Sequence, residues 1–283
     1  MIEGPVDNSG VHFIPKPYQP PIQISYDECK MSEPITNILS ALAVSAIITA
    51  MAKVRSQKLK SILYVLPFPI TIALIGSDSI ASSLSILGIV LTGFFLWGCH
   101  LLHHTLGMKI LYADALLALL YVALAYLLAQ TVNISLWNMM TIFLVMWFLL
   151  MMMFKDMVFS YRAKPPAPTN AWLKAITIFG IAFILFSAHQ YLAAFVVTFP
   201  YNGVFAVYEN RAGLLPQAAL FTRNSLALAA YFLANYLVGT HYSATLRYAV
   251  SWFAFGIVIV LVNKFVKIHV KDLNEYDQRK QIP

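Results

Sequence analysis

Long apolar runs recur through this chain and constrain its fold more than any other feature. After residue 35 there are about nine such runs, most of them close to the roughly 20 residues that a helix needs to cross a hydrocarbon core roughly 30 Å thick. Hydrophobic residues make up 60% of the 283 residues and charged residues only 11%. Soluble domains carry roughly 25% charged residues. The sequence therefore predicts an all-α polytopic membrane protein, with the lipid bilayer as its surroundings.

The nine predicted transmembrane helices follow from the apolar runs. They cover residues 36–53, 61–76, 80–102, 108–130, 134–154, 171–188, 191–208, 214–238 and 243–266.

Basic residues predict the orientation of these spans. The loop after the first span carries Lys53, Arg55, Lys58 and Lys60, and the positive-inside rule places such a loop in the cytoplasm. Alternation then puts the N-terminus outside and the basic tail, 267–283, in the cytoplasm. The loops predicted to face outward, at 76–79, 130–133 and 187–190, contain no Lys or Arg, in agreement with this orientation. The net charge of +7 thus indicates membrane topology, and we expect no nucleic-acid partner.

Residues 1–35 form a polar, proline-rich tail that is predicted to lie outside the cytoplasm. The tail has no apolar core of the kind that a cleaved signal peptide contains, so we expect the first membrane helix to direct insertion. Two cysteines, Cys29 and Cys99, occur without a CxxC motif, and they predict no disulfide framework or redox site.

The chain contains an internal repeat centred on two Phe-Pro pairs. The phrase LYVLPFPITIALIG (63–76) aligns with AFVVTFPYNGVFAVYE (194–209), so that Phe68 matches Phe199 and Pro69 matches Pro200. One apolar span precedes each phrase and two follow it. This predicts a four-span half at 36–130, a connecting helix and a proline-rich cytoplasmic linker within 131–170, and a second four-span half at 171–266. Because one helix separates the halves, the second half would be inverted, giving a 4+1+4 repeat.

Each half also resembles the small four-span GlpM-type membrane proteins of bacteria. The residues that carry the resemblance are TFPYNGVFAVYE followed by TRNSLALAAYFLANYL (222–237). The first half offers the matching phrase LPFPITIALIG but lacks a counterpart of Arg223. The resemblance covers most of the membrane part and none of the tail. It implies a duplicated protein of the bacterial inner membrane and leaves its activity open.

Inverted repeats are typical of transporters, which bind substrate near the midplane on discontinuous helices. The sequence thus predicts a secondary carrier or exporter for a small polar or anionic solute, with Pro69 and Pro200 breaking the helices that line its path. Arg223 lies about nine residues inside its span, where a guanidinium needs an anionic or carbonyl partner. We therefore predict Arg223, Asn224 and Asn202 as substrate-binding residues. A structural ion pair from Arg223 to Glu209 or Asp114 is the alternative.

Two carboxylates are predicted to couple transport to protons or cations. Asp114 lies about one and a half turns inside its span, although it could equally pair with Lys109 or Arg223. Glu209 follows Pro200 by half a span, and with Arg211 it could instead form a surface ion pair where the helix leaves the membrane.

The sequence gives little support for a metal site or a catalytic site. His100, His103 and His104 share one helix face at a spacing that can bind zinc or copper, but a histidine cluster at a membrane boundary favours an interfacial role. No phosphate-binding glycine loop, catalytic triad order or HExxH motif occurs, so we expect neither an enzyme nor a cofactor. The alternative function is a non-transporting membrane subunit that scaffolds a complex, with the N-terminal tail binding other subunits.

Overall fold

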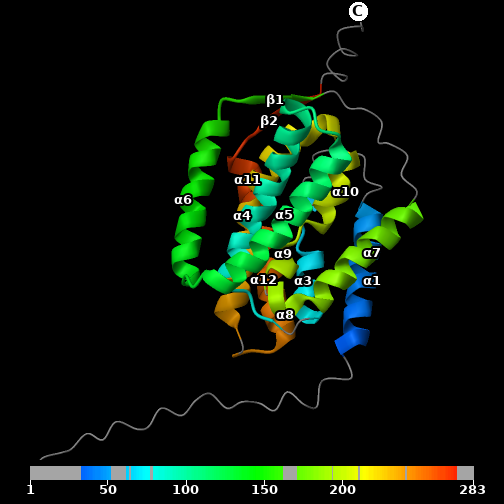
Figure 1. The fold of residues 1–283 in the computed structure, drawn as a ribbon. Coiled ribbons are helices and arrows are strands. Elements are labelled where there is room, and N and C mark those ends of the chain that lie inside the picture. The colour runs from blue at the N-terminus through cyan, green and yellow to red at the C-terminus, as the bar shows by residue number, and fades with distance from the viewer. Residues whose placement is uncertain are drawn as a thin grey trace, which may run out of the picture. The chain divides into compact units, whose positions relative to one another are not determined.

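The structure is a computed structural model, and it describes residues 33–51, 62–63, 65–76, 79–161, 171–192, 194–209, 211–239 and 241–272. The predicted N-terminal tail, the proline-rich linker at 162–170, the end of the C-terminal tail and Asp78 lie outside the described residues, apart from the start of the first helix at Glu33. The described part is mostly helical, as the apolar runs predict (Figure 1).

The helices follow the predicted spans in order. They are α1 (Glu33–Met51), α3 (Phe68–Gly76), α4 (Ser83–His100), the π-helical turn η2 (Leu101–Thr105), α5 (Ile110–Thr131), α6 (Leu136–Phe154), α7 (Ala171–Ser187), α8 (His189–Leu192), α9 (Phe195–Thr198), α10 (Tyr201–Glu209), the 3₁₀ turn η3 (Arg211–Gly213), α11 (Leu214–Val238) and α12 (Ala244–Phe265).

Local sequence explains where several of these helices begin and end. The hydroxyls of Ser135 and Ser243 accept bonds from the backbone N–H groups of Asn138 and Leu246, which caps the starts of α6 and α12. Gly239 has φ +52° and ends α11, and Gly107 with φ +69° makes the turn between η2 and α5. Serine caps and glycine stops thus divide the apolar sequence into separate helices.

Helix α11 forms the centre of the described bundle. It packs against α4, α6 and α12, and most of its residues are buried, including the polar Gln217, Asn224 and Asn235. The Asn235 side chain accepts a bond from Ala81 N–H at 3.0 Å, and near the other ends of the two helices Trp97 Nε1 donates to Thr222 Oγ1 at 3.3 Å. Because the residues just before α4 meet late α11 and late α4 meets the first part of α11, these two helices are antiparallel.

The outer helices carry large apolar side chains on their free faces. Leu119 on α5 is 71% exposed and Phe253 on α12 is 70% exposed, whereas polar side chains are concentrated on the buried α11. Among the described residues, four helical segments are long and apolar enough to cross a membrane: Ser83–Thr105, Ile110–Thr131, Leu136–Phe154 and Ala244–Phe265. An apolar exterior around a partly polar interior fits an integral membrane protein. The nine spans and the inverted repeat stay predictions at this point.

Two short strands add to the helical architecture where the sequence predicts none. Strand β1 (Val158–Tyr161) follows α6, strand β2 (His269–Asp272) follows α12, and the two pair in parallel (Figure 1). Four-residue strands are too short to produce a clear alternating pattern, so periodicity could not reveal them. Their pairing places the ends of α6 and α12 on the same side of the bundle.

Two predicted spans are not continuous helices. In the span predicted at 61–76, α3 occupies only Phe68–Gly76, and the span at 191–208 is divided among α8, α9 and α10. Prolines stand at the start of α3 and between α9 and α10, where they interrupt the helix because proline lacks an N–H and clashes with the preceding helical turn. These two segments are called the first and second broken elements below.

Candidate functional site

The two broken elements meet at one cavity, which we call the Phe-Pro cavity. Its volume is about 60 Å³, and its walls come from the first broken element, α4, the second broken element and α11. The lining residues are Leu66, Pro69, Ile70, Ile89, Thr92, Leu96, Val197, Thr198, Phe199, Pro200, Tyr201, Gly203, Gln217, Phe221 and Leu228. Pro69 and Pro200, 131 positions apart in the sequence, therefore line the same cavity.

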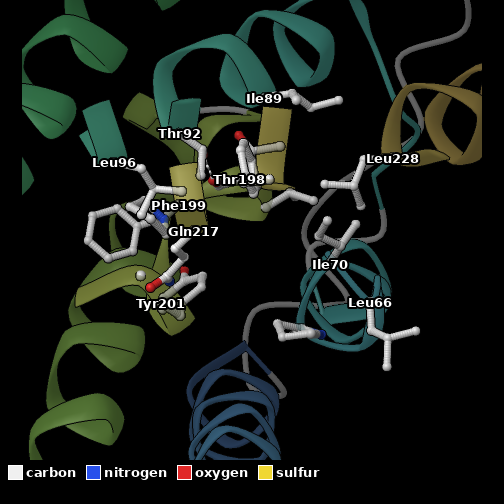
Figure 2. Close-up of a pocket in the computed structure, with 15 residues that line it drawn as sticks. Leu66, Ile70, Ile89, Thr92, Leu96, Thr198, Phe199, Tyr201, Gln217 and Leu228 are labelled. Atoms are coloured by element: carbon white, nitrogen blue, oxygen red, sulfur yellow. Dashed lines mark hydrogen bonds between the residues drawn. The ribbon is translucent and has the colours of Figure 1, made fainter. Parts of the chain in front are cut away.

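Four polar side chains line the otherwise apolar cavity: Thr92, Thr198, Tyr201 and Gln217. Figure 2 shows them gathered on one side, with Leu66, Ile70 and Leu228 on the other. These four residues could not be predicted as site residues from sequence, because isolated hydroxyl and amide groups in apolar runs are common packing features. Their nearness to a Phe-Pro pair was the one available signal, and it singles out only Thr198 and Tyr201.

The second broken element shows why hydroxyl groups gather here. In a continuous helix the carbonyl of Val196 would accept a bond from residue 200, but Pro200 has no N–H to donate. The Tyr201 hydroxyl donates to this carbonyl instead, at 2.9 Å. Thr92 Oγ1 on α4 donates to the carbonyl of Thr198 at 2.8 Å. Side chains thus bond to carbonyls that the break leaves open, as buried backbone requires.

A close helix crossing brings α4 against the second broken element. A Cβ atom added at Gly88 would clash with Oγ1 and Cβ of Thr198, so glycine at this position lets α4 lie directly against the Thr198 side chain. Thr198 Oγ1 also lies 3.1 Å from the hydroxyl of Tyr121 on α5. Helices α4 and α5 therefore hold the break in the second broken element.

The first broken element is held by Thr71. Its Oγ1 donates to the carbonyl of Pro67 at 2.7 Å, two positions before Pro69. The same oxygen lies 2.8 Å from the Tyr231 hydroxyl on α11 and accepts a bond from Trp252 Nε1 on α12 at 3.1 Å. Helices α11 and α12 therefore hold the break in the first broken element.

Arg223 and Asn224 do not line the Phe-Pro cavity. Arg223 lines a separate cavity of about 740 Å³ together with Asn263 on α12 and residues of both strands. Asn224 is fully buried, and its Oδ1 accepts bonds from Arg223 Nε at 3.1 Å and Asn263 Nδ2 at 3.3 Å. In this conformation Asn224 positions Arg223 and does not face an open space.

Arg223 is 8% exposed, and the described residues that its guanidinium bonds to are neutral. Its NH2 donates to Asn263 Oδ1 at 2.6 Å and its NH1 to the carbonyl of Val266 at 3.5 Å. Within the described part of the chain, it forms no ion pair with Glu209, Asp114 or any other acid. A buried cation without an anionic partner carries a desolvation cost of roughly several kcal/mol.

The two predicted coupling carboxylates differ in their surroundings. Asp114, on α5, is 5% exposed, and no described residue bonds to its Oδ1. Glu209 forms a buried ion pair of 2.7 Å with Lys174 on α7, so the partner expected from sequence, Arg211, is not the one found at Glu209 Oε1. Arg211 lies instead over the ring of Tyr208, 5.9 Å from its centre. Neither carboxylate lines the Phe-Pro cavity.

The remaining predicted residues have simpler positions. Asn202 lies in α10, but its side chain is outside the described part of the structure. The rings of His100 and His103 both pack against that of His104, at 4.9 and 4.7 Å between centres. His103 and His104 bond to the carbonyls of Met108 and Arg211. Within the described ranges, no three His, Cys, Asp or Glu side chains are grouped as metal ligands.

The chain was compared with known protein families, curated proteins and solved structures. No protein-family model, curated protein or solved structure matches the chain.

Proposed function

We propose that the chain is a membrane carrier for a small polar solute, with its path through the Phe-Pro cavity between two inverted repeats. The repeats are residues 36–130 and 171–266, and α6 connects them. The observation that carries the proposal is the meeting of both Phe-Pro breaks at one cavity with polar groups on its wall.

The arrangement of equivalent helices supports the inverted repeat. Helices α4 and α11 each follow a broken element, so they occupy the same position in the two halves. An inverted repeat requires such a pair to run in opposite directions, and the contacts of Ala81 with Asn235 and Trp97 with Thr222 give this direction.

The hydrogen bonds at the breaks are reciprocal, which also supports the repeat. The second broken element bonds to α4 and α5, and the first bonds to α11 and α12. Under the proposed repeat these are equivalent helix pairs, each serving the opposite half. Exchange of equivalent contacts is what a pseudo-twofold axis between the halves would produce.

The cavity itself supports binding of a small solute. Broken backbone at membrane depth is tolerated where protein buries it or where it borders a wet cavity, and carriers bind substrate at such breaks. A volume of about 60 Å³ has room for a few water molecules, which need about 10–15 Å³ each by this measure. We therefore interpret this conformation as a closed state of the carrier.

The residues that line the Phe-Pro cavity restrict the chemical class of solute that could bind there. No Asp, Glu, Lys, Arg or His is among the described residues that line the Phe-Pro cavity, while Thr92, Thr198, Tyr201 and Gln217 offer hydroxyl and amide groups. An uncharged polar solute fits such a wall better than an anion. Asp114 remains our candidate for coupling, and Glu209 serves better as an anchor of α10 on α7.

The proposed orientation and location rest on the sequence. The positive-inside rule puts the N-terminus outside and the C-terminus in the cytoplasm. The resemblance to GlpM-type proteins suggests the bacterial inner membrane.

Cysteine accessibility tests the carrier without knowledge of the solute. Leu96 lines the cavity without taking part in its hydrogen bonds. We would replace it in a Cys29→Ser background and treat Leu96→Cys with a membrane-impermeant cationic methanethiosulfonate in right-side-out and in inside-out vesicles. The native Cys99, which is fully buried, is the internal control.

A carrier must open the cavity to each side in turn, so we expect the Leu96→Cys thiol to react from both sides, well above the rate of Cys99. Reaction from a single side would contradict alternating access. Absence of reaction from either side would overturn the carrier and favour the scaffolding subunit, for which this region is a solid core.

A further inference from the structure

A second cavity, which we call the basic cavity, lies at the end of the bundle that carries the two strands. It has a volume of about 740 Å³, within the roughly 300–1,000 Å³ range of small-molecule sites. Its walls come from Leu220 and Arg223 on α11, Asn263 on α12, Val158 on β1 and the segment 267–270. It shares no lining residue with the Phe-Pro cavity. Any ligand bound here is therefore separate from a solute in the proposed path.

The ionisable side chains among the described residues that line the basic cavity are all basic. Arg223 lies in its wall, and Lys267 and His269 are more exposed and stand at its rim. None of the described residues that line this cavity is Asp or Glu. Cationic groups gathered in a recess attract an anion, because low-dielectric walls concentrate their field.

The Arg223 side chain is fixed in a geometry that leaves donors available. Asn224 and Asn263 bind its Nε and NH2, and their two amide groups bond to each other, so the guanidinium is held by a small network. A guanidinium has five N–H donors, and the described contacts use three of them. The network is thus a built anchor, nine-tenths buried, whose charge no described acid neutralises.

We propose that the basic cavity binds a phosphate group, with Arg223 as the buried anchor and Lys267 and His269 as contacts at the rim. The two Arg223 N–H groups that no described residue binds, together with the donors of Lys267 and His269, match the three or four oxygens of a phosphate better than the two of a carboxylate. Either the headgroup of an anionic lipid or a soluble phosphate ester could supply this group.

Ligand-induced stabilisation of the purified full-length protein tests the site. In a non-ionic detergent, the midpoint of thermal unfolding would be followed by tryptophan fluorescence in two titrations. Inorganic phosphate is compared with sodium chloride at equal ionic strength, and dioctanoyl phosphatidylglycerol with dioctanoyl phosphatidylcholine. A ligand that binds only the folded protein raises the midpoint in proportion to its affinity.

Three variants assign the effect to the cavity. Lys267→Gln removes an exposed contact, and we expect it to weaken binding about two- to fivefold. Arg223→Gln removes the anchor and should weaken binding at least about tenfold. Lys264→Gln changes the same charge on α12 outside the cavity, beside the ring of Phe265, and should leave binding unchanged.

Each outcome bears on the proposal. Stabilisation by phosphatidylglycerol alone identifies a lipid headgroup, and stabilisation by inorganic phosphate identifies a soluble phosphate. Equal weakening by Lys264→Gln and Lys267→Gln would overturn the site, because general surface charge would then explain binding. No stabilisation of the wild type in either titration would also overturn it. Neither result would affect the cysteine test of the Phe-Pro cavity.

Discussion

The first broken element and the second each interrupt a helix beside a Phe-Pro pair, yet the hydrogen bonds that hold them are distributed differently. In the first, one hydroxyl, that of Thr71, meets the Pro67 carbonyl, Tyr231 and Trp252. In the second, separate hydroxyls from Thr92, Tyr121 and Tyr201 contact the chain around α9. Among the described residues, the side-chain bonds at the first break thus converge on Thr71, whereas several side chains share those at the second.

The side chains of the second broken element are also more deeply buried than those of the first. All four residues of α9 are buried, and α10 is anchored by the Lys174–Glu209 ion pair. In α3, by contrast, Phe68 and Ile75 are among the exposed apolar side chains. This comparison indicates that the second element is the fixed side of the Phe-Pro cavity. If the cavity opens, we expect α3 to move.

The largest effect on the second element should come from removing its ion pair. Lys174→Met takes the ammonium away from the buried carboxylate of Glu209, and loss of one partner of a buried pair costs roughly 3–5 kcal/mol of unfolding free energy. Detergent-denaturation titration would measure the loss. Lys264→Met, at an exposed position of α12, is the matched control. A double change to Lys174→Met and Glu209→Leu should recover part of the stability, and no recovery would mean that the charges are not coupled.

The next largest effect should come from the close crossing at Gly88. Gly88→Ala forces α4 away from Thr198, and overpacking of this kind costs about 1–3 kcal/mol. Gly256→Ala on α12 is the control, since no atom lies within 4 Å of its added Cβ, and alanine there should change stability by no more than about 1 kcal/mol. Equal stability of the two variants in detergent denaturation would contradict a tight contact between α4 and α9.

The smallest effects compare the two breaks directly. Thr71→Val leaves the Tyr231 hydroxyl and Trp252 Nε1 without their shared partner, and we expect a loss of about 2 kcal/mol. Thr92→Val removes one bond to the carbonyl of Thr198 and should cost about 1 kcal/mol. Both values come from the same denaturation titration. If Thr92→Val proves the more harmful, the supposed dependence of the first break on one hydroxyl is wrong.

Only part of the candidate site could be predicted from the sequence. The prolines were found from sequence because a missing N–H disrupts a helix wherever it occurs, and Pro69 and Pro200 do share a cavity. Arg223 was expected at the same place, but it lines a different cavity. On α11, Gln217 and Phe221 are one turn apart and face the Phe-Pro cavity, whereas Leu220 and Arg223 project about a quarter turn or more away from them.

The sequence by itself determined the helical, apolar character of the chain and the two places where its helices break. Those properties depend on hydropathy summed along a segment and on proline chemistry, both of which are local. The tertiary structure decided that α11 is central, that β1 and β2 pair, that Lys174 is the partner of Glu209, and that Arg223 and the prolines line separate cavities. Such contacts depend on which helix faces meet, and many apolar faces in this chain are nearly equivalent in sequence.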